Sequence, residues 1–178
     1  MKMAWGSTIN FFLVFLTLLL LAGFQSTFWY QFLGKIAAPM LWLNVLVFVM
    51  LYRRTLPAAL SIYLMSYALL SFTSMPLGIM WISLILLFAL VYLIKTRVFW
   101  SGPGYFTLIS AFAVVAFHVI YFLCSIFIEK KQPSFEVMDR LIQFILTPTF
   151  AFPTYWLLKK IDDHSLDELT RETGGLEL

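Results

Sequence analysis

The sequence has a single cysteine, few charged residues and almost no charge inside its long apolar runs. Charged residues make up 12% of its 178 residues, and Cys124 is the one cysteine. One cysteine excludes an intramolecular disulfide and a cysteine-rich metal cluster, and its place in an apolar run predicts simple packing. Scarce charge, 62% hydrophobic residues and a mean hydropathy of +0.91 exclude an ordinary soluble domain. The composition therefore predicts a polytopic integral membrane protein.

The apolar runs also lack the side chains that chemistry inside a bilayer requires. An ionisable side chain is costly there and is kept mainly for a use. The sequence has no Ser/His/Asp set, no paired intramembrane carboxylates, no metal-ligand spacing and no glycine-rich phosphate loop. These absences argue against an enzyme, a cofactor or metal site and an ion-coupled transporter. Basic residues flank the apolar runs, which indicates membrane orientation and makes nucleic acid an unexpected partner.

Six apolar runs approach the length that crosses a membrane, which is about 20 residues. They lie at about residues 9–24, 36–52, 56–72, 79–94, 105–128 and 137–158. No signal-peptide cleavage site follows the first run, so we expect an uncleaved helix there. The predicted fold is an all-α polytopic bundle of about six transmembrane helices over residues 1–160, followed by a short cytoplasmic tail at 161–178. Five spans remain the alternative if the first or second run is re-entrant.

Basic residues at the ends of the runs predict the orientation. With six spans both termini share one side, and cytoplasmic loops carry the excess of Lys and Arg. Counting eight basic residues on the side of the termini against four on the other, we expect both termini in the cytoplasm. The larger group is Lys2, Arg53, Arg54, Lys95, Arg97, Lys159, Lys160 and Arg171, and the smaller is Lys35, Lys130, Lys131 and Arg140.

Small and polar residues form a stripe on the fifth run. Ala111, His118 and Ser125 recur every seven residues, which places them on one helix face that we expect to point into the bundle. His118 could be a proton relay or a ligand. A single intramembrane histidine without a carboxylate or second histidine is more often a neutral hydrogen-bonding group between helices. We therefore predict that His118 is buried and structural.

A second polar stripe follows the sixth run, where Pro148 and Pro153 predict kinks and freed carbonyl groups that nearby threonines could satisfy. Asp139 and Arg140 lie in its first turn, where an orienting role is more plausible than an active site. The stripe recurs every three or four residues at Arg140, Gln143, Thr147, Ala151 and Thr154, and predicts a packing face. Asn44 in the second run is similarly predicted to join helices. The candidate interhelix polar contacts are Asn44, His118, Ser125, Arg140, Gln143 and Thr147.

Two further motifs leave alternatives open. Tyr63 and Tyr67 lie one turn apart beside Ser66 on the third run, where they could line a ligand cavity or pack between helices, and packing is the simpler interpretation. In the tail, Ser165 and Glu168 fit a capping box that would begin a separate short helix ending near residue 174. That segment is either a solvated acidic terminus, which we favour, or a docking helix.

The order of these features resembles the family of the rod shape-determining protein MreD. The resemblance covers nearly the whole chain. It includes a short first helix, a proline that opens an apolar span (Pro-Met-Leu-Trp-Leu, residues 39–43) and a break into Pro-Leu-Gly (residues 76–78). The final helix contributes Pro-Thr-Tyr-Trp-Leu-Leu-Lys-Lys-Ile-Asp at residues 153–162.

This resemblance implies a non-enzymatic component of the bacterial inner membrane that serves the peptidoglycan-synthesising elongation machinery. It implies association with the bitopic protein MreC and, through it, with the RodA glycosyltransferase and a penicillin-binding transpeptidase. It also implies a fold similar to the substrate-binding S-components of energy-coupling-factor transporters. A vitamin-binding S-component is therefore the alternative function, and it would need a polar-lined cavity at the outer face.

Overall fold

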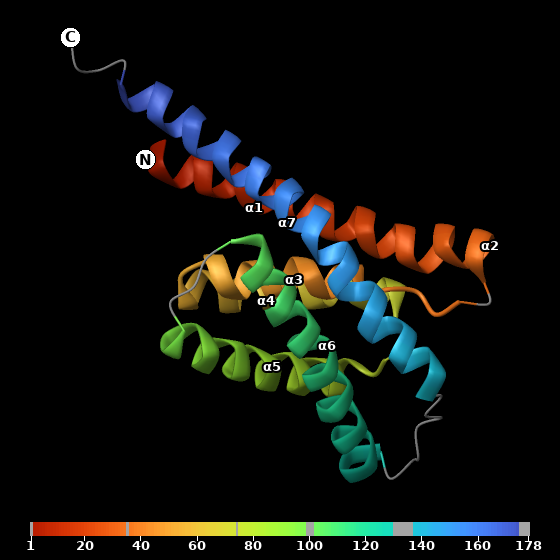
Figure 1. Ribbon diagram of the computed structural model, residues 1–178. Helices are drawn as coiled ribbons and strands as arrows, with labels where there is room; N and C mark the ends of the chain where they lie inside the picture. The colour runs from red at the N-terminus through yellow and green to blue at the C-terminus, as the bar shows by residue number, and fades with distance from the viewer. Residues whose placement is uncertain (1, 35, 74, 99–101, 130–136, 175–178) are drawn as a thin grey trace.

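The computed structural model describes residues 2–34, 36–73, 75–98, 102–129 and 137–174, and for residues 2–7, 129 and 165–174 the backbone alone. The described residues form seven α-helices, with short π-helical and 3-10 turns between them (Figure 1). They confirm the predicted all-α polytopic bundle. The elements are α1 (Lys2–Gly23), η1 (Phe24–Phe28), α2 (Trp29–Leu33), α3 (Leu41–Tyr52), α4 (Thr55–Leu69), η2 (Leu70–Phe72), α5 (Leu77–Arg97), α6 (Pro103–Cys124), η3 (Ser125–Glu129) and α7 (Val137–Gly174).

Five helical segments are long and apolar enough to cross a membrane, so the chain is a multi-pass membrane protein. They are Thr8–Leu33, Thr55–Phe72, Leu77–Arg97, Pro103–Ile128 and Val137–His164. The second apolar run differs from its prediction, because only Leu41–Tyr52 is helical. Its 12 residues rise about 18 Å, well short of the roughly 30 Å of hydrocarbon. The segment before it is irregular backbone, which a membrane protein tolerates only where protein or water surrounds it.

Helix α3 forms the centre of the bundle and packs against α1, α4, α5, α6 and α7. Ten of its 12 residues are buried, on every side of the helix. A helix that is apolar all round must be enclosed by other helices, which agrees with this position. Phe48 on α3 lies 6.0 Å from Phe106 on α6, and Phe106 lies 5.6 Å from Tyr155 on α7, measured between ring centroids. These aromatic contacts join three helices around α3.

The start of α1 and the end of α7 lie at the same end of the bundle, which we call the terminal end (Figure 1). This terminal end also holds Arg53 after α3 and Lys95 near the end of α5, since Lys95 donates to the Arg53 carbonyl oxygen at 2.8 Å. Arg53 and Lys95, two of the basic residues predicted to share one side, therefore lie together at this end. The side chains of Lys2, Lys35, Lys130, Lys131 and Arg171 lie outside the described residues.

Helix α7 corrects the predicted start of a new helix in the tail. It continues from Val137 to Gly174 without a break, so Ser165 lies inside a helix and is not its N-cap. Between Pro153 and Gly174 the chain has no proline or glycine to end the helix, and a continuous helix keeps its backbone hydrogen bonds. Pro148 and Pro153 also lie within this helix.

The threonines of α7 form hydrogen bonds near these prolines, at carbonyl groups other than the freed ones. Each proline frees the carbonyl four residues earlier, at Phe144 and Thr149. Instead, the Thr149 hydroxyl donates to the Ile145 carbonyl at 2.9 Å and the Thr154 hydroxyl to the Phe150 carbonyl at 2.7 Å. For Thr149 and Thr154, the prediction that they satisfy the freed carbonyl groups is therefore wrong.

The buried face of α6 differs from the stripe that its polar residues predicted. Its fully buried side chains include Phe106, Ala113 and Phe117, which lie more than a quarter turn away from Ala111 and His118 around the helix. Ala111 and His118 are half-buried. Large apolar side chains occupy the face toward the core because they gain most from burial. Cys124 is buried, as its position in an apolar run predicted.

Candidate functional site

The first polar network joins α6, α7 and the extended segment before α3. Arg140 Nη1 lies 3.0 Å from His118 Nε2 and donates to Gln143 Oε1 at 3.1 Å. The other end of the Gln143 amide donates to the Ala38 carbonyl oxygen at 3.2 Å. Three of the predicted contact residues therefore meet in one network, and they tie the segment before α3 to the bundle.

Both ring nitrogens of His118 have hydrogen-bond partners. Its Nδ1 lies 2.7 Å from the carbonyl oxygen of Val114, which can only accept, so Nδ1 carries a proton. Its Nε2 lies 3.0 Å from the guanidinium of Arg140 and 3.0 Å from Gln143 Oε1. The ring is therefore engaged on both sides by groups of α6 and α7. The arrangement favours a structural role, although His118 is half-buried where full burial was predicted.

The second polar network holds the beginning of α3 inside the bundle. The backbone N–H of Met40 donates to Thr147 Oγ1 at 2.9 Å, and the N–H of Leu41 donates to Gln25 Oε1 at 3.1 Å. Asn44 donates from its amide to the Thr147 carbonyl oxygen at 3.0 Å. The first N–H groups of a helix have no partner within the helix. Side chains from η1 and α7 supply these partners, which allows α3 to begin away from water.

An ion pair at the terminal end joins three helices. Arg53, just after α3, lies 2.6 Å from Asp162 on α7, and Asn10 on α1 donates to the same carboxylate oxygen at 3.0 Å. Arg53 also donates to Asn10. Lys95 on α5 donates to the carbonyls of Met50 and Arg53. This cluster positions the helix ends. Its charged side chains bond to one another and to backbone carbonyl groups.

Three further residues in these contacts, Gln25, Asn10 and Asp162, were not among the predicted contacts. Each is a polar side chain within a helix that directly follows an apolar residue. That position was the available signal, but it does not identify a partner. Of the predicted contacts, Asn44 and Thr147 share the second network, and Ser125 is buried in η3 with 2% of its surface exposed.

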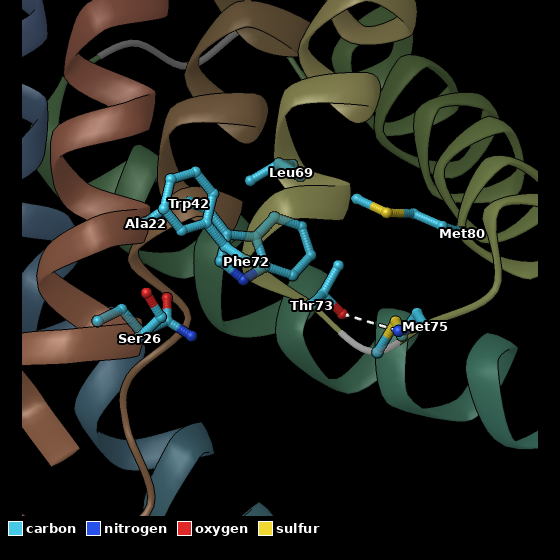
Figure 2. Close-up of a pocket in the computed structure, with 9 residues that line it drawn as sticks. Ala22, Ser26, Trp42, Leu69, Phe72, Thr73, Met75 and Met80 are labelled. Carbon is cyan, nitrogen blue, oxygen red and sulfur yellow. Dashed lines mark hydrogen bonds between the residues drawn. The ribbon is translucent and has the colours of Figure 1, made fainter.

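A small cavity lies at the end of the bundle opposite the termini. Figure 2 shows Ser26 of η1, Trp42 of α3 and Phe72 of η2 around it, with the Thr73 hydroxyl accepting from the Met75 N–H at 3.2 Å. Its volume is about 30 Å³. Pockets that enclose drug-sized ligands measure about 300–1,000 Å³. This cavity has room for about one water molecule.

A larger apolar groove runs between α4 and α5, and we call it the α4–α5 groove. It has a volume of about 260 Å³. Ile62 and Leu84 are buried at its base. Ile85 on its wall has 66% of its surface exposed, so the groove opens to the outside of the bundle. Its other residues are Ala59, Tyr63, Ser66, Trp81 and Phe88. Tyr63 and Ser66, which could have lined a cavity or packed between helices, therefore line a groove.

Among the described residues, no group of three His, Cys, Asp or Glu side chains is placed to hold a metal ion. The polar side chains described above hold helices together, and the α4–α5 groove is the feature best suited to contact another molecule. No protein-family model, curated protein or solved structure matches this chain.

Proposed function

We propose that this chain is a non-enzymatic scaffold of the bacterial cell-elongation machinery, located in the inner membrane, that holds an MreC-like single-span partner by helix packing. The observation that carries this proposal is the α4–α5 groove, which is apolar and opens sideways where lipid would surround the protein. Helices in a bilayer associate through close packing and a few hydrogen bonds. The resemblance of the chain to the MreD family supports the choice of partner.

The first polar network and the ion pair after α3 are consistent with a role without turnover. His118, Arg140 and Gln143 bond to one another and to backbone, and Arg53 is paired with Asp162. Groups that act as an acid, base or nucleophile need access to a reacting atom. In this chain the same groups are used to fix α3 and α7, which is what a rigid scaffold requires.

The alternative is a substrate-binding S-component of a vitamin transporter. Such a protein needs a polar-lined cavity at the face opposite the cytoplasmic termini. The cavity found at that end measures about 30 Å³, roughly a tenth of the smallest pocket that encloses a drug-sized ligand. This difference favours the scaffold.

Depletion in the source organism tests the proposal. We expect rod-shaped cells to become round, and we expect purification in mild detergent to recover an MreC-like single-span protein, with RodA-type glycosyltransferase and transpeptidase as indirect companions. Native mass spectra of the purified chain should show no bound vitamin. Unchanged cell shape, or recovery of an ATP-driven coupling module with a tightly held small molecule, would favour the transporter alternative.

A further inference from the structure

Tyr63, which lines the α4–α5 groove, shares a hydrogen bond with the hydroxyl group of Tyr67, one turn further along α4. The hydroxyl oxygens of Tyr63 and Tyr67 lie 3.1 Å apart. Both side chains are exposed, with 47% and 45% of their surfaces accessible. Trp81 packs against both rings, at centroid distances of 5.0 and 5.2 Å. The two hydroxyls are therefore held in place at the surface of the bundle.

A count of donors shows that this pair is incomplete. Two hydroxyls supply two O–H groups, and the bond between them uses one. Among the described residues no partner is recorded for the second O–H. Ser66, deeper in the groove, is satisfied because it donates to the Tyr63 carbonyl at 2.6 Å and accepts from the Trp81 indole at 2.7 Å. The unused donor thus lies at the tyrosine pair and points to a ligand that can accept it.

The depth of the pair decides what that ligand can be. The span Thr55–Phe72 rises about 1.5 Å per residue, so Tyr63 and Tyr67 lie about 12 and 18 Å from its start. These positions flank the middle of a hydrocarbon layer about 30 Å thick. Exposed tyrosines are favoured at the interface, as at Tyr92, five residues before the end of α5. Lipid tails offer no acceptor at mid-depth, so lipid would leave the O–H unsatisfied.

We infer that the α4–α5 groove binds one transmembrane helix of a single-span partner, which presents a hydrogen-bond acceptor to Tyr63 and Tyr67 and an apolar side chain to Ala59 and Ile85. This inference rests on the proposed scaffold function and names the surface that performs it. A carbonyl or side-chain oxygen of Ser, Thr, Asn or Gln supplies the acceptor, and polar groups of this kind join helices in membranes. The groove between two helices accommodates the ridge of a third.

Photo-crosslinking in the native membrane tests the location. A benzoylphenylalanine at Ile85, on the groove, is compared with one at Ile145 on α7; the two isoleucines have 66% and 65% of their surfaces exposed. We expect Ile85 to yield an adduct that mass spectrometry identifies as the apolar segment of a single-span protein, and Ile145 to yield none. An adduct at Ile145 alone would overturn the groove assignment while leaving the scaffold function intact. Adducts at Ile85 with lipid alone, or with a second copy of this chain, would also overturn it. If no single-span protein crosslinks at either position or copurifies, the scaffold function itself fails.

Two pairs of variants test the chemistry of the contact. The double variant Tyr63→Phe/Tyr67→Phe removes both hydroxyls and should lower the Ile85 adduct yield about threefold to tenfold, while Tyr92→Phe should leave it unchanged. Ala59→Leu fills the groove and should abolish the adduct, whereas Ala89→Leu, on an exposed part of α5, should not. An unchanged yield in either groove variant, with the protein present at its normal level, would contradict the inference.

Discussion

Single hydrogen bonds to backbone groups determine where α3 can begin. Thr147 is fully buried, and its hydroxyl accepts from the N–H of Met40, the residue just before α3. A buried donor that loses its partner costs about 1–3 kcal/mol, more than the bond itself contributes. Thr147 is thus more important than its small size suggests.

Replacing Thr147 by valine preserves the shape of the side chain and removes the acceptor. We expect Thr147→Val to lower the free energy of unfolding by about 1–2 kcal/mol, because the Met40 N–H is then buried without a partner. Unfolding by sodium dodecyl sulfate in mixed micelles measures this. Thr149→Val is the matched control, since Thr149 is exposed and bonds within its own helix. Equal effects of the two variants would contradict the proposed role of Thr147.

His118 allows a second test at the residue scale. Glutamine can still accept from Arg140 and donate to a carbonyl, so His118→Gln should change the free energy of unfolding by less than about 1 kcal/mol and preserve cell shape. His118→Leu removes the acceptor of a partly buried guanidinium and should cost about 1–2 kcal/mol. A glutamine variant that accumulates normally but fails to maintain rod shape would instead support a proton relay.

At the scale of elements, the short α3 is fixed at both ends by other helices. Its beginning is held by η1 and α7, and the chain just after its end is held by α1, α5 and α7 through Arg53. The burial of ten of its 12 residues supplies the apolar contact between these anchors. Because the helix is too short to span the bilayer by itself, its position depends on these contacts.

The ion pair after α3 gives the element-scale prediction. Asp162→Asn weakens the bond to Arg53, and we expect a loss of about 1 kcal/mol in the free energy of unfolding. This is less than a fully buried pair would lose, because the Arg53 and Asp162 side chains are 30% and 18% exposed. Asp163→Asn, at the exposed neighbouring residue, should have no measurable effect. In an Arg53→Gln background the loss from Asp162→Asn should shrink, and full additivity would exclude the coupling.

At the scale of the whole molecule, the two ends of the bundle differ in charge. The terminal end collects the Arg53–Asp162 pair and Lys95, whereas the opposite end holds η1, η2 and the small cavity. If the basic end faces the cytoplasm, as its Lys and Arg residues predict, the small cavity faces outward.

Cysteine accessibility tests this orientation in a Cys124→Ser background. Ser71 in η2 and Thr96 near the end of α5 are both exposed and lie at opposite ends. We expect a membrane-impermeant maleimide to label Ser71→Cys in intact cells, and Thr96→Cys only after the membrane is permeabilised. The reverse pattern would invert the proposed topology.

The sequence predicted the features that depend on neighbouring residues. The runs predicted at about residues 56–72, 79–94 and 105–128 correspond to the helical segments Thr55–Phe72, Leu77–Arg97 and Pro103–Ile128, and α3 ends at Tyr52, the predicted end of the second run. Hydropathy and helix-breaking residues act over one or two turns. An apolar helix and its ends can therefore be recognised from neighbouring residues, without knowing which other helix it packs against. The packing face of α7 followed for the same reason, and Thr147, Ala151 and Thr154 are buried as expected.

By itself the sequence determined a membrane bundle of α-helices, because the length and hydropathy of the runs leave no other way to satisfy the backbone in a bilayer. The tertiary structure alone decided how the beginning of α3 is held inside the bundle, since the side chains of Gln25 and Thr147 that accept from the Leu41 and Met40 N–H groups lie 16 and 107 residues from their partners. It alone also decided that Tyr63 lines an open groove. Whether a helix face is covered depends on the distance to the next helix, and that distance is set by side chains on both.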